Sequence, residues 1–231
     1  MLQPALPIGG TTCSSSVSFR REICCGNGYP GSGMSEKKLH RICVFCASSF
    51  GVDPVYLSVA TELGDSIAKA GFGLVYGGAS VGLMGAVADA ALVRGAEVIG
   101  VLPEALSNRE IAHPGLTELH KVGTMHERKA LMASYADAFV ALPGGYGTFD
   151  EFLEILTWAQ LRIHAKPCVL INTKGYYDGL LNFLDHAVGE GFLKHKNREL
   201  LLVAKDVEES LQLVRNHWVR GRTAPELKNL P

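Results

Sequence analysis

The chain has 231 residues, of which 47% are hydrophobic and 19% charged, and its net charge at pH 7 is −1. This length and composition suit one α/β domain with a substantial core, and the small net charge gives no field that would attract nucleic acid or an anionic membrane. No apolar run reaches the roughly 18 residues that predict a transmembrane helix. An anionic ligand would therefore have to be bound by local groups.

Residues 1–38 differ in composition from the rest of the chain. They are rich in Ser, Gly and Pro and contain no acidic residue before Glu22. This composition resembles an organelle transit peptide and also fits a disordered extension, which we favour. The internal Met34 fits a third interpretation, an upstream extension of a shorter protein. We expect one domain over 39–220, a tail over 221–231, and a cytoplasmic location with organelle targeting left open.

From residue 41 onward, strand and helix patterns alternate. Strands are predicted at 42–47, 73–76, 97–102, 138–142, 168–172 and 200–203, with a further strand-like segment at 119–122. Helices are predicted at 54–70, 81–94, 125–135, 149–162, 179–189 and 207–218. The strands are continuous apolar runs, which indicates burial on both faces. The pattern therefore predicts a single Rossmann-like α/β domain, a parallel sheet with helices on both faces.

The six cysteines do not form the dense framework of a small secreted domain. Cys43 and Cys46 form a C-x-x-C pattern inside the first apolar strand, and no second Cys/His pair has the spacing of a zinc site. We interpret both as buried strand residues of a reduced, intracellular protein and predict no metal site.

Two glycine clusters follow predicted strands, and ligands of such sheets bind beyond the carboxyl ends of the strands. Glycine lets the backbone approach a ligand, and the first N–H groups of a helix attract anions. Neither cluster is a Walker loop or a G-x-G-x-x-G turn, since Ala79 takes the second glycine position. We predict phosphate binding, with tight strand–helix packing as the alternative, by a loop at 143–148 and a possible second loop that includes Gly78, Ser80, Val81 and Gly82.

Charged residues stand close to two predicted helix starts, one beside the loop at 143–148 and one after the strand-like segment at 119–122. Glu151 lies one turn inside the helix that starts at the glycine loop, near any phosphate held there. For Asp150, stabilisation by the helix dipole is a sufficient explanation. Arg128 and Lys129 lie near the start of the helix predicted at 125–135, where cations are unfavourable. They suggest a ligand, because Arg holds phosphate or carboxylate bidentately and Lys adds a point charge.

Together these motifs resemble the LONELY GUY family of cytokinin-activating phosphoribohydrolases over about residues 41–218. The family signature PGGxGTxxE is matched by residues 143–151, and further matches lie at 44–49, 76–85, 125–129 and 156–160. Ala47 and Ala79 stand where the family often has glycine. We expect them to tighten their loops, with narrowing of the nucleotide pocket by Ala79 left open.

The resemblance implies hydrolysis of the N-glycosidic bond of a cytokinin nucleoside 5′-monophosphate, giving an N6-substituted adenine and ribose 5-phosphate. It also implies a homodimer with sites near the interface and no redox or pyridoxal cofactor. It makes Arg128 and Glu151 the catalytic pair, and a carboxylate beside the sugar suits the positive charge that this reaction builds on ribose. The residues it places around the nucleotide are Glu110, Lys129, Gly145, Tyr146, Gly147, Thr148, Phe149, Asp150 and Thr157.

Two other functions stay open at this point. One is a purine nucleotide nucleosidase acting mainly on AMP, and the other is a non-catalytic nucleotide or cofactor carrier, against which the presence of both Arg128 and Glu151 argues. A lysine decarboxylase is not expected, because no motif anchors pyridoxal phosphate on a lysine. An apolar N6 substituent would need apolar walls, for which the candidates, each also suited to ordinary core packing, are Met84, Met125, Met132 and Trp158.

Overall fold

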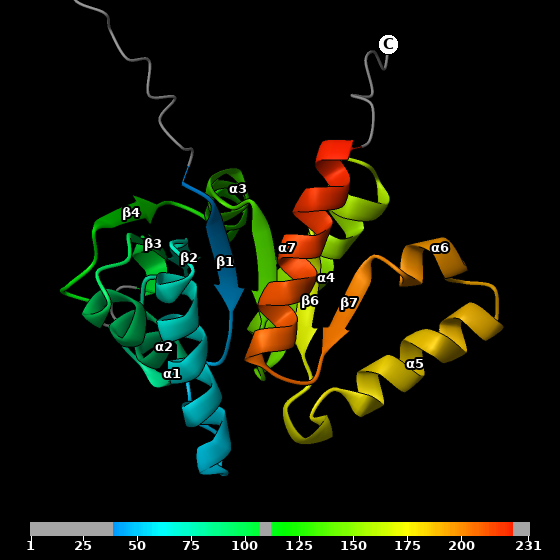
Figure 1. The fold of residues 1–231 in the computed structure, drawn as a ribbon, viewed down its shortest axis with the longest axis horizontal. Coiled ribbons are helices and arrows are strands. Elements are labelled where there is room, and N and C mark those ends of the chain that lie inside the picture. The colour runs from blue at the N-terminus through cyan, green and yellow to red at the C-terminus, as the bar shows by residue number, and fades with distance from the viewer. Residues whose placement is uncertain (1–38, 107–111, 224–231) are drawn as a thin grey trace, which may run out of the picture. The chain divides into compact units, whose positions relative to one another are not determined.

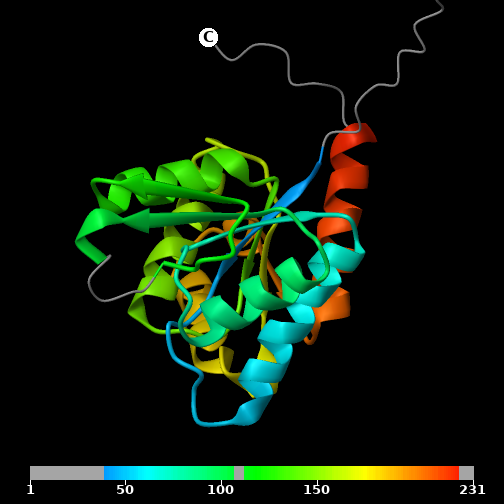
Figure 2. The ribbon, with the colours of Figure 1, turned by 90° about the vertical axis from the view of Figure 1, so that its left-hand side faces the viewer.

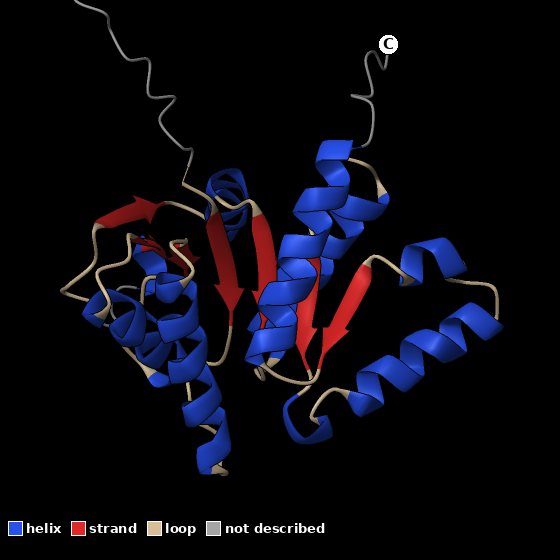
Figure 3. Ribbon diagram, viewed as in Figure 1, coloured by secondary structure: helices blue, strands red, loops and turns tan. Residues whose placement is uncertain are grey.

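The computed structural model describes residues 39–106 and 112–223. Within them the chain forms a parallel sheet of 7 strands in the order β4-β3-β2-β1-β5-β6-β7, which confirms the predicted fold (Figure 3). The strands are β1 Arg41–Phe45, β2 Gly73–Tyr76, β3 Val98–Pro103, β4 Glu118–Val122, β5 Ala138–Ala141, β6 Cys168–Ile171 and β7 Leu201–Ala204.

Helices cover both faces of this sheet. The α-helices are α1 Pro54–Lys69, α2 Gly82–Val93, α3 Met125–Tyr135, α4 Tyr146–Gln160, α5 Asp178–Gly189, α6 His195–Arg198 and α7 Val207–Thr223, with 3-10 turns at Glu104–Leu106 and Thr173–Gly175. Buried side chains of α1, α2 and α7 share one core with the sheet, and those of α3 and α4, with α5 packed against them, share the other. In Figures 1 and 2, α1 and α7 lie side by side on one side of the strands.

Successive strands β1 to β4 are added toward one edge of the sheet, and β5 to β7 are added toward the other edge, starting beside β1. Strands β1 and β5 pair in parallel, with Phe45 opposite Ala141, so their carboxyl ends leave the sheet together. Just beyond them, the Ala47 N–H donates to the Pro143 carbonyl at 3.3 Å, which joins the two loops. Ligands of doubly wound sheets bind at such a reversal of strand order. The loop at 143–148 therefore lies where the fold favours a binding site.

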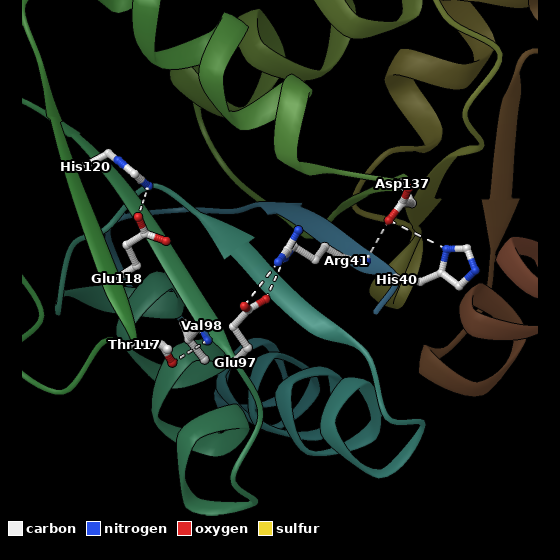
Figure 4. A network of polar contacts seen from close by, with 8 residues as sticks. All are labelled: His40, Arg41, Glu97, Val98, Thr117, Glu118, His120 and Asp137. Atoms are coloured by element: carbon white, nitrogen blue, oxygen red, sulfur yellow. Dashed lines mark hydrogen bonds and ion pairs between the residues drawn. The ribbon is translucent and has the colours of Figure 1, made fainter. Parts of the chain in front are cut away.

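The opposite, amino-terminal edge of the sheet is held by a polar network (Figure 4). The Nε and Nη2 atoms of Arg41 donate to the two carboxylate oxygens of Glu97, at 2.6 and 3.1 Å. The backbone N–H of Arg41 donates to the Asp137 carboxylate at 3.0 Å. The Val98 N–H donates to the Thr117 hydroxyl at 2.9 Å. These contacts join the starts of β1, β3, β4 and β5, so we assign the network to stability of the sheet.

Several helix boundaries differ from the sequence predictions. Helix α4 begins at Tyr146 rather than at residue 149, because the apolar pattern that marks the helix starts only after a glycine-containing first turn. Helix α7 continues to Thr223 instead of ending at 218, and the short helix α6 was not predicted. The predictions for residues 1–38, for Glu110 and for residues 224–231 of the tail fall outside the described residues. None of the described helices has the length and apolarity that crossing a bilayer requires.

Candidate active site

A cavity of about 290 Å³ opens at the carboxyl edge of the sheet, where β1 and β5 end. The start of α4 forms one wall, and the loop after β1 forms another. The lining residues are Cys46, Ala47, Ser48, Ser49, Met84, Arg128, Gly145, Tyr146, Gly147, Thr148 and Glu151. Six of these eleven were predicted as site residues: Arg128, Glu151 and the segment from Gly145 to Thr148.

A buried ion pair lies in the wall of this cavity. Arg128 Nη1 is 3.1 Å from Glu151 Oε1, and the two side chains are only 7% and 9% exposed. The Arg128 Nε–H donates to the Val101 carbonyl at 3.1 Å, so β3 also fixes the direction of the guanidinium. Each charge of such a pair depends on the other, because an unpaired buried charge is strongly destabilising. The structure thus holds one carboxylate and one guanidinium at fixed positions beside the cavity.

The start of α3 fixes the position of Arg128. The Thr124 hydroxyl accepts from the Glu127 N–H at 3.1 Å, and the Glu127 carboxylate accepts from the Thr124 N–H at 3.1 Å, which is a capping box. Arg128 follows at once and is buried, although a cation near a helix N-terminus is unfavourable. Its pairing with Glu151 offsets that cost.

The start of α4 has no side-chain cap. Gly145 is the N-cap residue, and the N–H groups of Tyr146, Gly147 and Thr148 belong to the first turn, where a helix has no acceptors of its own. A Cβ placed on Gly145 or Gly147 would meet no protein atom within 4 Å, so packing does not require glycine at either position. These features leave free space beside uncapped N–H donors, which is the arrangement of an anion site.

Gly144 has a different role from its two neighbours. A Cβ there would overlap the hydroxyl of Thr148, whose side chain is only 4% exposed. Gly144 thus lets the threonine pack against the loop, which leaves the two following glycines to face the cavity.

The glycine-rich segment at 77–85 is hydrogen-bonded to the loop after β1. The N–H groups of Leu83 and Met84, at the start of α2, donate to the Ala47 carbonyl at 3.1 and 3.4 Å. Gly82 has φ +59°, and a Cβ there would overlap the backbone of Ser48. Gly82 therefore allows the start of α2 to pack against Ser48. Phosphate binding by Gly78, Ser80, Val81 and Gly82 stays a prediction. Two of the four, Ser80 and Gly82, line a hollow of about 1220 Å³ beside α1 and α2.

Lys129 lies next to the catalytic candidates but outside the cavity lining. Its Nζ atom is 3.0 Å from Asp150 Oδ2 and 2.7 Å from Glu154 Oε2, so it links α3 to α4. Burial disfavours the ammonium, but hydrogen bonds to Glu154 and Asp150 outweigh burial and raise the pKa of Lys129. A lysine that forms Schiff bases requires the opposite shift.

The other predicted binding residues on α4 also lie outside the cavity lining. The Phe149 ring packs against Tyr177 with centroids 6.0 Å apart, and the Thr157 hydroxyl donates to the Leu153 carbonyl at 2.8 Å. Asp150 is exposed and paired with Lys129.

Of the candidate walls for an apolar substituent, only Met84 lines this cavity. Met132 is completely buried in the core against which Trp158 packs, and Met125 is 39% exposed. Ala79 also lies in the core and does not line the cavity.

The lining residues that were not predicted come from the loop after β1, at 46–49. The sequence does contain an indication of this loop, since two serines, Ser48 and Ser49, follow the apolar strand predicted at 42–47. Placing that loop beside the one at 143–148 requires the strand order, which periodicity does not provide.

Comparison with known proteins now defines the family. The cytokinin riboside 5′-monophosphate phosphoribohydrolase LOG3 of Arabidopsis thaliana is 48% identical over 179 residues, covering 78% of this chain and 83% of the relative. The cytokinin riboside 5′-monophosphate phosphoribohydrolase of Rhodococcoides fascians is 49% identical over 176 residues, covering 76% of this chain and 89% of the relative. The chain belongs to the LONELY GUY family. The stretch that resembles the LONELY GUY signature, 143–151, carries both the start of α4 and Glu151.

Two further similarities accompany the LONELY GUY relationship. Residues 84–214 match the family model described as "Possible lysine decarboxylase". The fold is similar to that of the Moco carrier protein from Chlamydomonas reinhardtii, with a TM-score of 0.60 and 26% identity, covering 79% of this chain and 99% of that chain. Within the described residues, no group of three or more His, Cys, Asp or Glu side chains could hold a metal ion.

Proposed function

We propose that this protein hydrolyses the N-glycosidic bond of cytokinin riboside 5′-monophosphates and releases the free base and ribose 5-phosphate. The observation that carries the proposal is the buried Arg128–Glu151 pair in the wall of a cavity that the uncapped start of α4 also lines. One wall suits a phosphate, and the other offers a carboxylate for the sugar. The names of the relatives at 48% and 49% identity support the same reaction.

In this proposal the phosphate binds the first-turn N–H groups of α4 and the hydroxyl of Thr148. The ribose then lies beside Glu151. As the C–N bond breaks, the base leaves with the bonding electrons and positive charge develops on the ribose, where the Glu151 carboxylate stabilises it. The water oxygen bonds to the anomeric carbon as a hydroxyl group, and the proton that the water loses neutralises the leaving base. Arg128 keeps Glu151 oriented and adds positive charge near the phosphate.

The remaining predicted residues receive roles that match their places. We assign Gly145, Tyr146, Gly147 and Thr148 to phosphate binding. Lys129 and Asp150 hold α3 against α4 behind the site, and Phe149 and Thr157 belong to the body of α4. At about 290 Å³ the cavity lies at the lower end of the roughly 300–1,000 Å³ typical of small-molecule pockets, a size that suits the ribose phosphate part of the substrate.

The proposal is tested by chromatography of the full chain incubated separately with isopentenyl-AMP, AMP and isopentenyladenosine. We expect base from isopentenyl-AMP, slower release from AMP and none from the nucleoside. Equal or faster release from AMP would instead identify a broader purine nucleotide nucleosidase. Tight nucleotide binding without release of free base would identify a carrier, the function named for the structural relative.

The matched variants are Glu151→Gln and Asp150→Asn, which remove one charge each from neighbouring positions. We expect the first to fold normally and to lose about 10²–10⁴-fold in rate, the usual scale for a positioned catalytic group. Asp150→Asn should keep most activity, because its carboxylate is exposed and outside the cavity. Retained turnover in Glu151→Gln would contradict the catalytic assignment.

We further infer a homodimer, located in the cytoplasm and without nucleic-acid partners. Support for the dimer comes from three exposed apolar residues that line one hollow beside α1 and α2, where Phe50 is 54%, Leu57 39% and Val93 86% exposed. Contiguous exposed apolar residues commonly mark protein contacts, and most homo-oligomers are symmetric dimers. Light scattering should give twice the chain mass, and Val93→Glu should shift the protein toward the monomer. Support for a reducing compartment comes from the described cysteines, which are free and buried.

A further inference from the structure

We propose that Tyr176 is a positioning residue that aims the Gly145 N–H into the phosphate site; the inference rests on the function proposed above. The Tyr176 hydroxyl donates to the Gly144 carbonyl at 2.7 Å. The adjacent Tyr177 hydroxyl donates to the Leu142 carbonyl, also at 2.7 Å. Two consecutive tyrosines, from the connection between β6 and α5, thus hold two carbonyls of the segment that leads into α4.

Side-chain contacts fix the turn that carries these tyrosines. The Asn172 side chain accepts from the Tyr177 N–H at 2.8 Å and donates to Asp178 at 2.7 Å. Lys174 has φ +52°, a backbone conformation that few non-glycine residues adopt, and its ammonium pairs with Asp53 at 2.6 Å. The turn is therefore anchored both to the start of α5 and to the N-cap residue of α1, which makes its tyrosines a fixed support.

Peptide geometry converts the Tyr176 contact into a direction for the Gly145 N–H. The described residues contain no cis peptide bond, and in a trans peptide the C=O and the following N–H point in opposite directions. Tyr176 approaches Gly144 O from a neighbouring cavity of about 240 Å³, which shares Ala47, Ser49 and Gly145 with the candidate active site. The Gly145 N–H therefore points away from Tyr176, and we infer that it faces the active-site cavity, which Gly145 lines. It adds one donor to those of the first turn of α4.

The two tyrosines have separable effects. The peptide held by Tyr177 joins Leu142 to Pro143, which has no N–H, so the Tyr177 hydroxyl fixes only the end of the strand. Tyr177 is also 2% exposed, and burial raises the pKa of its hydroxyl, as expected for a group inside the core. Loss of the Tyr177 hydroxyl should lower stability, whereas loss of the Tyr176 hydroxyl should affect the phosphate site.

The test measures binding apart from turnover. Ribose 5-phosphate and free isopentenyladenine are titrated by calorimetry into the full-length wild type and into Tyr176→Phe. Tyr56→Phe is the matched control, because its ring lies 5.9 Å from the Tyr176 ring and lines the same neighbouring cavity. We expect Tyr176→Phe to weaken ribose 5-phosphate binding about 3- to 10-fold, the scale of one hydrogen bond. Binding of the free base should stay unchanged.

The outcomes separate this inference from the proposed function. Wild-type affinity for ribose 5-phosphate in Tyr176→Phe, equal losses for sugar phosphate and base, or an equal effect of Tyr56→Phe would each overturn the positioning role. So would a wild type that does not bind ribose 5-phosphate. A wild type that binds it in a Tyr176-dependent manner but releases no base would leave the positioning role intact and contradict only the enzymatic proposal.

Discussion

Gly77 lies against the guanidinium of Arg128 so closely that no side chain fits between them. A Cβ on Gly77 would overlap Arg128 Nη2 and lie 2.9 Å from Met84 Sδ. The Gly77 carbonyl is 3.5 Å from the same nitrogen. Gly77 begins the glycine-rich segment at 77–85, for which we predicted phosphate binding by Gly78, Ser80, Val81 and Gly82. At position 77 the group that approaches is instead the arginine of the candidate catalytic pair.

Gly77→Ala should therefore lower activity while the chain still folds. The added methyl group displaces the guanidinium from Glu151, and a misplacement of about 1 Å at a reacting centre costs on the order of 10²-fold in rate. The measurement is base release from isopentenyl-AMP, with circular dichroism to check folding. Gly189→Ala is the control, since a Cβ there meets nothing within 4 Å. Full activity in Gly77→Ala would show that the arginine position is not critical.

Gly147→Ala should separate stability from binding. Gly147 is the second residue of α4, where alanine favours a helix by up to about 1 kcal/mol. Its methyl group would occupy the open space beside the uncapped N–H groups. We expect an equal or higher melting temperature and at least about tenfold weaker ribose 5-phosphate binding. Gly179→Ala, at the second position of α5 and equally open, should gain the stability alone.

Lys129→Met should act mainly on stability. The substitution leaves Asp150 and Glu154 without their shared partner, and Glu154 is only 24% exposed. We expect a loss of about 1–3 kcal/mol in the free energy of unfolding, measured by urea denaturation, with kcat within a few-fold of wild type. Direct nucleotide binding by Lys129, as the family resemblance implies, would instead raise KM at unchanged stability. The exposed Lys121 provides the control variant Lys121→Met.

His164 should make stability depend on pH below about 6.5. Burial lowers its pKa, aided by the charge of Lys166 and opposed by the hydrogen bond to the Ile155 carbonyl. Its Nε2 donates to that carbonyl at 3.0 Å while Nδ1 accepts the Lys166 N–H at 3.1 Å, so the folded state holds the neutral ring.

The sign of the effect follows from proton binding. The unfolded chain takes up a proton near the ordinary value of 6.5, before the folded chain does, so the unfolded state binds more protons as the pH falls. The contribution of His164 to stability is thus complete above pH 6.5 and is lost as the pH falls through its folded pKa. Urea denaturation between pH 8 and pH 5 should show a smaller loss in His164→Gln than in wild type. The exposed His186→Gln should retain the wild-type slope.

The sequence was informative about the fold because each buried strand is a continuous apolar run between amphipathic helices. It was less informative at α4, where the glycine-containing first turn carries no apolar periodicity and the predicted start fell at Phe149 rather than Tyr146. That shift matters for Asp150 and Glu151. The first turn of the observed helix contains no acidic residue, so the helix dipole does not account for either.

The candidate site was predictable where one segment carried its residues and harder where it depended on contacts between distant segments. Arg128 and Glu151 were found through charges close to helix starts. The partners of Lys129 and the hydroxyl contacts of Tyr176 depend on side chains from separate elements, which no periodicity specifies.

Ala47 accepts two N–H groups of α2 through its carbonyl and donates its own N–H to Pro143. The loop after β1 is thereby joined to both glycine segments, one on each side of it in the sheet. Local opening of any one of the three would break hydrogen bonds shared with another, so this edge should open cooperatively, with exchange of the Ala47, Leu83 and Met84 amides approaching the rate of global unfolding. A substrate would accordingly enter a cavity that is already formed, rather than one that it must open by parting the loops.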